Sequence, residues 1–381
     1  MLAPHDFFNI CRKQGISFFT GVPDSLLQDL CAFLTERLPS NEHVIAANEG
    51  GAIGLAAGHY LATGKPALIY LQNSGQGNAI NPLLSLSDPE VYGIPMLLLV
   101  GWRGEPGIKD EPQHLKQGRV TMALFTSMEI PCQILETDNQ AAVGQITKML
   151  ELARREKRPV ALIVRKGTFK KHVKREDEQN QNPLTREQAI ACVASLSPPN
   201  VVIIASTGHI SRELYEYRER ECQDHSRDFL TVGSMGHASQ IALGVALADP
   251  TRIVYCFDGD GALLMHLGAM PLIGQSRCHN LRHILLNNGV YGSVGGQATG
   301  ALNLDFVKIA KACGYAFAVR ATSSLGLKKQ LITMNKVKGP SFLEIRVSRL
   351  FRLDLGRPGL TPAENKEGFM TFLRKQLSID T

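Results

Sequence analysis

Apolar runs of strand length recur along the chain without the alternation of apolar and polar residues that marks a half-exposed strand. Five lie at 16–22, 43–48, 66–72, 94–101 and 158–165, and five more at 200–207, 228–233, 252–259, 281–288 and 340–347. Such runs are typical of strands buried on both faces, as in a parallel sheet. Helical patterns separate them, for example at 25–38 with Ser25 as N-cap, at 51–64 ending in glycine, and at 239–248.

This alternation of strands and helices predicts an α/β fold with two tandem, doubly wound parallel-sheet domains. The hydrophobic periodicity stops in a polar stretch, so we expect domains at 1–173 and 186–381 joined by a linker at 174–185. Pro271 falls inside the helical pattern that follows the run 252–259, and it should kink or end that helix.

Composition narrows the class of protein. Of 381 residues, 44% are hydrophobic and 20% charged, which excludes a disordered or fibrous chain. The longest apolar stretch, 94–102, is far shorter than a membrane span, and residues 1–15 lack the order of a signal peptide. The eight cysteines form no CxxC pair, and the net charge of +6 is modest. We therefore expect a soluble, cytoplasmic protein that binds neither membranes nor nucleic acid.

The stretch "RIVYCFDGDGALLMH" (252–266) carries the strongest chemical signal. A strand ends in a glycine turn and a helix follows, so the backbone N–H groups of Gly259 and Gly261 could face a phosphate. Asp260 beside such an anion suits a bridging Mg²⁺, and a second strand brings Asn287 and Asn288 to its carboxyl end. The alternative is that the aspartates cap a helix and the asparagines form a turn.

The GDG triplet at 259–261, followed after about 25 residues by the NN pair at 287–288, resembles the cofactor motif of the thiamine diphosphate-dependent decarboxylases and carboligases. The resemblance implies thiamine diphosphate and Mg²⁺ as cofactors, with Asp260, Asn288 and the Val290 carbonyl as metal ligands. It also implies a glutamate in the other domain that hydrogen-bonds N1′ of the aminopyrimidine. Glu49 in "AANEGGAI" fits that role, and the alternative is a glutamate at a helix start.

The same resemblance assigns further residues. Met235 in "GSMGHAS" would wedge the cofactor into a bent shape, unless it is simply a core residue. Asp24 and Ser25 of "GVPDS" would assist protonation. The other expected cofactor contacts are Asn73, Ser74, Thr207, Gly208, Gly259, Gly261 and Ala262.

Over nearly its whole length the chain is similar to the phosphonopyruvate decarboxylases, close kin of the sulfopyruvate decarboxylases. The segments that carry this similarity are 21–25, 47–53, 72–83, 101–114, 233–239, 259–270 and 285–297. The implied reaction is non-oxidative decarboxylation of 3-phosphonopyruvate to phosphonoacetaldehyde and CO₂ in phosphonate biosynthesis, by an enzyme without a middle domain.

The anionic substrate requires cations, and the loop "GWRGEPGIKDEPQH" (101–114) follows a predicted strand. We expect Arg103 to contact the phosphonate, with Lys109 as second choice and His114 nearby. The alternative is a salt-bridged surface loop, because the acidic residues Glu105, Asp110 and Glu111 lie in the same stretch.

The family also implies a homodimer or homotetramer with active sites between subunits. The competing functions are decarboxylation of sulfopyruvate, a carboligase reaction of two keto acids, and a non-catalytic nucleotide-binding role. Sulfopyruvate enzymes often divide the two domains between separate subunits, so the fused chain is expected to favour phosphonopyruvate.

Overall fold

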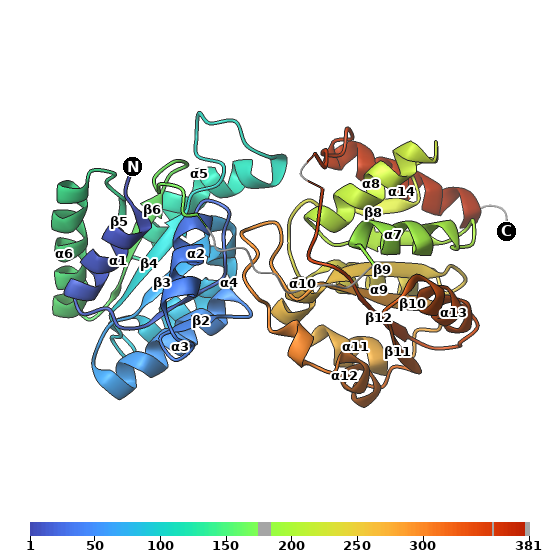
Figure 1. The fold of residues 1–381 in the computed structure, drawn as a ribbon, viewed down its shortest axis with the longest axis horizontal. Helices are drawn as coiled ribbons and strands as arrows, with labels where there is room; N and C mark the ends of the chain where they lie inside the picture. The colour runs from blue at the N-terminus through green and yellow to red at the C-terminus, as the bar shows by residue number, and fades with distance from the viewer. Residues whose placement is uncertain (174–183, 353, 378–381) are drawn as a thin grey trace. The chain divides into compact units, whose positions relative to one another are not determined.

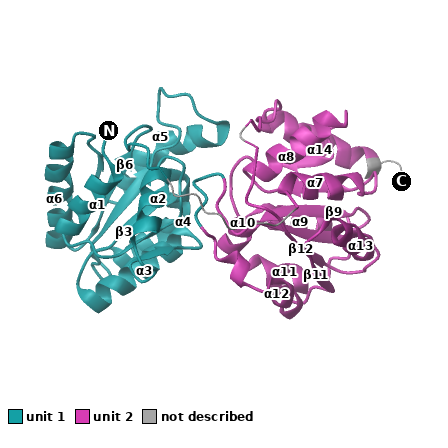
Figure 2. Cartoon of the chain, viewed as in Figure 1, with its two compact units in different colours: residues 1–177, 293–297 teal, residues 178–292, 298–381 magenta. Residues whose placement is uncertain are grey.

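The computed structural model describes residues 1–173, 184–352 and 354–377. The chain forms two compact units, residues 1–177 with 293–297 and residues 178–292 with 298–381 (Figure 2). The expected linker at 174–185 lies outside the described residues except for its last two positions. Across the described ranges, every helix is too short or too polar to cross a membrane.

The first unit is built on a six-stranded parallel sheet with the order β2-β1-β3-β4-β6-β5 (Figure 1). Its strands are β1 (Phe19–Gly21), β2 (His43–Ile45), β3 (Leu68–Gln72), β4 (Met96–Gly101), β5 (Cys132–Ile134) and β6 (Pro159–Val164). Helices α1 (Pro4–Lys13), α2 (Gln28–Arg37) and α6 (Asn139–Glu156) share one core with the sheet. Helices α3 (Glu49–Thr63), α4 (Gln76–Pro82) and α5 (Pro112–Ser127) share the other. Short turns of helix lie at η1 (Asn73–Gly75) and η2 (Leu83–Ser87).

The second unit repeats this plan with the parallel order β11-β12-β10-β9-β7-β8. Its strands are β7 (Val202–Ala205), β8 (Asp228–Leu230), β9 (Val254–Gly259), β10 (Leu281–Asn287), β11 (Phe317–Ala321) and β12 (Ser341–Arg346). One core contains α7 (Arg186–Ser195), α8 (His209–Arg220) and α13 (Ser324–Asn335). The other contains α9 (Ala238–Ala248), α10 (Asp260–Met265), α11 (Ala269–Gln275), α12 (Phe306–Ala312) and α14 (Pro362–Leu377), and η3 (Ala301–Asn303) joins it.

The fold class is confirmed, and each of the ten predicted runs contains a strand. The edge strands β5 and β11 were not predicted, because their partial exposure leaves no continuous apolar run. Ser25 is not an N-cap: α2 begins three residues later, after Leu27, and the Ser25 hydroxyl is bound elsewhere.

Pro271 has the predicted effect on the helix that follows β9. The helix α10 ends at Met265, and α11 begins at Ala269 with Pro271 in its first turn. A proline is tolerated there because the first N–H groups of a helix have no intrahelical acceptor. The break leaves Asp260 at the start of a short helix.

A buried ion pair fixes the start of β8, which leads toward the predicted wedge residue. Arg218 of α8 and Asp228 are 1% and 0% exposed. The guanidinium donates to both carboxylate oxygens, at 2.7 and 2.9 Å. Removing one partner would leave an uncompensated charge in the core.

We therefore predict that Asp228→Ala lowers the free energy of unfolding by about 3–5 kcal/mol. Denaturant unfolding of the cofactor-free protein measures this change. Glu221→Gln is the control, since Glu221 is exposed and pairs with Arg220 on the same helix; it should cost less than about 1 kcal/mol. Equal losses in the two variants would contradict the assigned importance of the buried pair.

Candidate active site

Strands β9 and β10 are neighbours and end at the same edge of the sheet of the second unit. Gly259 pairs with Leu286, so the turn that carries Asp260 and the turn that carries Asn288 follow directly on adjacent strands. Asp260 and Asn288 are 3% and 4% exposed. The structure thus brings together the two halves of the predicted metal motif, at the edge where parallel sheets bind ligands.

Asp258, the other aspartate of the motif, is bound within the core. Its carboxylate accepts the Gly259 N–H at 2.9 Å and lies 3.3 Å from Nε2 of His283. Nδ1 of His283 lies 3.0 Å from the Tyr315 hydroxyl. Cys256 joins Asp258 and His283 in a fully buried group whose ligand atoms lie within 4.8 Å of one another. Because hydrogen bonds already account for the carboxylate and the ring, we assign no metal to this group.

Asn287, the other asparagine of the pair, also has a structural role. Its Nδ2 donates to Glu344 at 2.9 Å, and its Oδ1 accepts the Gly289 N–H at 3.1 Å. Glu344 in turn forms ion pairs with Arg320 and Arg346. The two asparagines therefore differ, and Asn287 anchors the turn that carries Asn288.

Asp260 is a buried carboxylate whose described surroundings hold no ion-pairing lysine or arginine. The Thr299 hydroxyl donates to it, yet burial raises the pKa of Asp260 to about 6. Asn288 Oδ1 accepts the Val290 N–H at 3.2 Å, and the Val290 carbonyl accepts the Gly292 N–H at 3.0 Å. Since an amide or carbonyl oxygen has two lone pairs, each keeps one for a cation.

Gly261 lies at the start of α10, where two larger side chains approach its backbone. A Cβ there would lie 2.5 Å from the Tyr291 ring and 3.3 Å from the Met235 methyl group. Only glycine leaves room for both, so the end of the Met235 side chain lies against the GDG turn. Ala262 follows in the same helix turn and is buried.

Thr207 and Gly208 lie between β7 and α8, and Gly208 caps the helix with φ of 91°. Sequence reasoning missed the next residue, His209. A Cβ on Gly292 would lie 3.8 Å from both the His209 ring and the Asn288 carboxamide. His209 therefore lies beside the turn that carries Asn288. Burial, and secondarily two nearby arginines, lowers the pKa of His209 to about 4. This histidine is therefore neutral at pH 7.

In the first unit, Glu49 is the first residue of α3 and is 5% exposed. Its Oε2 accepts a hydrogen bond from Asn78 Nδ2 at 2.7 Å. A Cβ on Gly75 would lie 2.2 Å from Oε1, so only glycine fits against this oxygen. Burial raises the pKa of Glu49 although Asn78 opposes the shift. The prediction had missed Asn78 and Gly75, and their one signal was the glycine-rich "SGQGN" after a strand.

Asp24 is fully buried beyond β1 and is held by neutral donors. It accepts Gln72 Nε2 at 2.6 Å and the Leu26 N–H at 2.9 Å, and burial raises its pKa. A Cβ on Gly101 would lie 2.1 Å from the Asp24 carboxylate. Ser74 extends the network, since its hydroxyl donates to Gln72 Oε1 at 2.6 Å.

Arg103 follows β4 as predicted, but its charge is already paired. Nε and Nη2 donate to both oxygens of Asp110 at 2.8 and 2.5 Å, and Nη1 donates to the Ser25 hydroxyl at 2.9 Å. Burial alone would raise the pKa of Asp110, but hydrogen bonds from Arg103 and two backbone N–H groups hold it well below its usual range. Arg103 is thus salt-bridged within its loop in this structure.

The other residues expected at the substrate loop have different surroundings. Lys109 is exposed, and no carboxylate in the described part of the chain forms an ion pair with it. His114 is buried at the start of α5. Asn73 is buried and donates to the Arg103 carbonyl at 2.8 Å and to the Thr121 hydroxyl at 2.9 Å. It is therefore better placed to hold the loop than to contact a cofactor.

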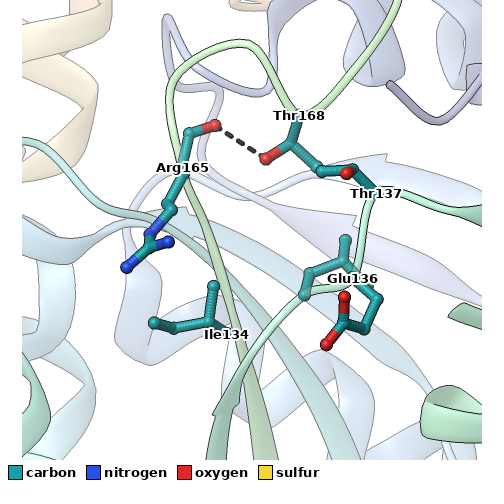
Figure 3. A pocket seen from close by; sticks show the side chains of 6 residues that line it. Ile134, Glu136, Thr137, Arg165 and Thr168 are labelled. Atoms are coloured by element: carbon teal, nitrogen blue, oxygen red, sulfur yellow. Dashed lines mark hydrogen bonds between the residues drawn. The ribbon is translucent and has the colours of Figure 1, made fainter. Parts of the chain in front are cut away.

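A separate cavity of about 320 Å³ lies at the carboxyl ends of β5 and β6 (Figure 3). It is lined by Ile134, Leu135, Glu136, Thr137, Arg165 and Thr168. The Arg165 side chain is paired with Glu105 at 2.8 Å. In the sheet order this cavity lies at the end opposite β2 and β1, away from Glu49 and Asp24, so we do not include it in the candidate site.

Comparison with known proteins identifies the two units. The N-terminal thiamine pyrophosphate (thiamine diphosphate) binding domain of the thiamine pyrophosphate enzymes matches residues 2–124, and the C-terminal binding domain matches residues 206–345. A phosphonopyruvate decarboxylase of Streptomyces viridochromogenes is 34% identical over 94% of this chain and 92% of its own. The chain belongs to the phosphonopyruvate decarboxylase family of thiamine pyrophosphate enzymes.

Sulfopyruvate decarboxylases are also similar. That of Methanosarcina acetivorans is 28% identical over 93% of this chain and 92% of its own. In Methanococcus maripaludis, subunits alpha and beta match 43% and 46% of this chain separately. The Methanosarcina relative spans both units in one chain, so fusion of the domains is not by itself specific to phosphonopyruvate decarboxylases.

The residues at the two sheet edges fit a thiamine pyrophosphate enzyme. Asp260 is a buried carboxylate whose described donors are all neutral, so a divalent cation would compensate its charge, and oxygens of Asn288 and Val290 lie in the adjoining turn. Glu49 is a buried carboxylate of raised pKa, and Asn78 donates to one of its two oxygens, which suits a group that hydrogen-bonds a pyrimidine nitrogen.

The burial of Glu49 predicts a pH-dependent change in stability. The pKa of Glu49 in the folded protein is raised above the usual 4.5. Its contribution to the free energy of unfolding is therefore fully present below pH 4.5 and is lost as the pH rises through the folded pKa. Glu49→Gln cannot ionise, and the cofactor-free variant should have a higher Tm than wild type at pH 8. The difference should vanish near pH 4. Glu151→Gln, exposed on α6, is the control, and equal Tm values for Glu49→Gln and wild type at pH 8 would contradict the buried carboxylate.

Proposed function

We propose that the chain catalyses the non-oxidative decarboxylation of 3-phosphonopyruvate to phosphonoacetaldehyde and CO₂, with thiamine diphosphate and Mg²⁺. The observation that carries this proposal is the similarity to a phosphonopyruvate decarboxylase over almost the full length of both chains. Glu49 and Asp260 are buried carboxylates that form no ion pair with a described residue, and they would supply the chemistry that this reaction needs. Phosphonate biosynthesis in a reducing cytoplasm is the proposed context, and eight free cysteines support that compartment.

When bound, the cofactor supplies a C2 carbanion and accepts the electrons left when CO₂ departs. Glu49 would hydrogen-bond N1′ of the aminopyrimidine and share a proton with it. Its raised pKa suits this task, because a group that exchanges a proton works best when its pKa lies nearer the working pH. Asn78 holds one oxygen of Glu49 and so orients the other.

The second unit would hold the metal and the diphosphate. Asp260, Asn288 and the Val290 carbonyl would bind Mg²⁺, which prefers such oxygen ligands together with phosphate and water. Backbone N–H groups near Gly208 and Gly261, with the neutral His209, would face the diphosphate. The remaining proposed contacts in this unit are Thr207, Gly259, Ala262 and Met235.

For the substrate, we propose that Lys109 is the principal cation for the phosphonate. It is exposed and forms no ion pair with a described carboxylate, whereas the charge of Arg103 is balanced by Asp110. Arg103 would then orient Ser25 and the loop. Asp24, whose pKa is raised by burial, would serve as an acid during protonation of the product.

We also infer a homodimer or homotetramer with active sites between subunits. On α3 an apolar face containing Gly54, Leu55, Gly58 and Leu61 is exposed. Apart from the nearby backbone of α3 itself, no described atom lies within 4 Å of a Cβ built on Gly54 or Gly58, so this face is not covered by another described element. A second copy of the chain would bury it. The separate alpha and beta subunits of the Methanococcus relative support an assembly in which such domains meet across chains.

The experiment that tests the function is CO₂ release from 3-phosphonopyruvate, sulfopyruvate and pyruvate, each with and without thiamine diphosphate and Mg²⁺. We expect release to require both, with kcat/KM for phosphonopyruvate at least about tenfold above either competitor. A preference for sulfopyruvate would establish the second candidate, which the Methanosarcina similarity favours. Absence of release from any keto acid would support a non-catalytic role.

A metal-site control accompanies this assay. Asp260→Ala should abolish the Mg²⁺-dependent part of thiamine diphosphate binding, measured by calorimetry. Asp258→Asn is the matched comparison, because it removes the neighbouring charge yet retains an acceptor for the Gly259 N–H. Undiminished cofactor affinity in Asp260→Ala would remove Asp260 from the metal site.

Substrate recognition gives a further prediction. Lys109→Ala should raise KM for phosphonopyruvate by at least about tenfold and change KM for pyruvate by less than about twofold, because only the former carries the additional anion. Lys116→Ala, an exposed lysine of α5, should change neither value. If Arg103→Ala shows this selective effect and Lys109→Ala does not, the original choice of Arg103 is restored.

A further inference from the structure

The turn that carries Met235 has an unfavourable backbone. Ser234 has φ of 51° and Gly236 has φ of 86°, so left-handed residues flank Met235 on both sides. A serine in this conformation is strained and persists only where its surroundings hold it. The contacts of this turn should therefore include a group that holds it.

The His237 ring provides such a contact. Its Nδ1 lies 3.1 Å from the Ser234 carbonyl oxygen and 3.2 Å from the Met235 carbonyl oxygen. Because both partners are acceptors, Nδ1 must carry the proton and donate. A single imidazole N–H thus contacts the carbonyl groups of two consecutive residues of the strained turn, Ser234 and Met235.

A second histidine lies behind the turn. A Cβ on Gly236 would lie 2.5 Å from Cδ2 of His266, so the turn rests directly on that ring. The centroids of the His237 and His266 rings are 4.5 Å apart. Burial, then the neighbouring His237, lowers the pKa of His266. His266 directly follows α10, the helix that begins at Asp260.

We propose that His237 and His266 are positioning residues that clamp Met235 over the GDG turn. His237 ties the strained backbone from one side, and His266 supports Gly236 from the helix that begins with the metal ligand. The clamp would couple the position of the Met235 side chain relative to the GDG turn to the position of Asp260. The catalytic consequence of the clamp rests on the proposed function, in which Met235 bends the cofactor. The existence of the clamp does not rest on the proposed function.

The clamp is tested first in the cofactor-free protein. The methyl group of Met235 and the Tyr291 ring both lie against Gly261, so the methyl resonance in a ¹³C-methyl-methionine spectrum reports the position of the turn. We expect His237→Ala to shift or broaden this resonance, and His237→Asn, whose Nδ2 can donate, to restore it. His225→Ala, which removes a histidine stacked on Tyr215, should leave it unchanged. An unchanged Met235 resonance in His237→Ala, with the fold intact by circular dichroism, overturns the clamp.

The second test is a double-mutant cycle on deuterium exchange at C2 of the bound cofactor. His237→Ala should slow exchange at least about tenfold while diphosphate affinity changes less than about threefold. If His237 acts through Met235, the double variant with Met235→Ala should be no slower than Met235→Ala alone, within about twofold. If the double variant instead slows C2 exchange by the product of the two single effects, His237 acts independently of Met235, and the proposal is overturned.

Failure of the proposed function gives a different pattern. If Met235→Ala exchanges C2 at the wild-type rate, Met235 does not activate the cofactor and the catalytic consequence is overturned. The methyl spectra would still decide the clamp by themselves. His266→Ala could disturb the end of α10, so we compare it with His266→Phe, which keeps a ring against Gly236. The clamp requires that the Met235 resonance lie nearer its wild-type position in His266→Phe than in His266→Ala.

Discussion

The cost of burying a carboxylate separates the structural residues of this chain from its chemical ones. Four buried acids are each paired with an arginine: Glu213, Asp228, Asp249 and Glu344. Asp258 is paired with a histidine. Among the described residues that are buried, the acids held only by neutral donors are Asp24, Glu49 and Asp260, bound by Gln72, Asn78 and Thr299. Burial raises the pKa of each of these three acids, because neutral donors leave much of the desolvation cost uncompensated. Burial raises the pKa of Asp228 as well, despite Arg218, so the difference between the two groups is the ion pair and not the pKa shift.

The arrangement of these acids follows from parallel strands. In each unit the candidate residues come directly after strands whose carboxyl ends share one edge, β9 and β10 for Asp260 and Asn288, and β1, β2 and β3 for the first unit. The strand interiors below are tied by polar networks through Asp258 and Asn287. Neighbouring residues of the same motif therefore have different roles: Asp258 and Asn287 anchor the turns, and Asp260 and Asn288 lie toward the edge of the sheet where a ligand would bind.

The candidate residues Asp260, Asn288 and Glu49 could be proposed from the sequence because in each case the strand, the turn and the proposed residue are adjacent in the chain. Contacts between residues that are distant in sequence could not be predicted in this way. Arg103 was expected to be available for the substrate, but its Nε and Nη2 donate to Asp110. This pairing depends on the conformation of the loop between the two residues. Asn73 turned out to bind the Arg103 backbone, and Asn78 became visible only through its distance from Glu49.

The sequence by itself determined the fold class, the strands buried on both faces and the turns that follow them, because hydrophobic periodicity and glycine placement are local properties. It also indicated the break between α10 and α11 shortly before Pro271, since the effect of a proline on a helix is confined to the adjacent turn. Only the tertiary structure decided which charges are neutralised and which buried acids are not, because pairing of ions depends on side chains that are distant in the chain. The bridging of the strained Met235 turn by His237 was decided in the same way, by a geometry that no spacing in the sequence encodes.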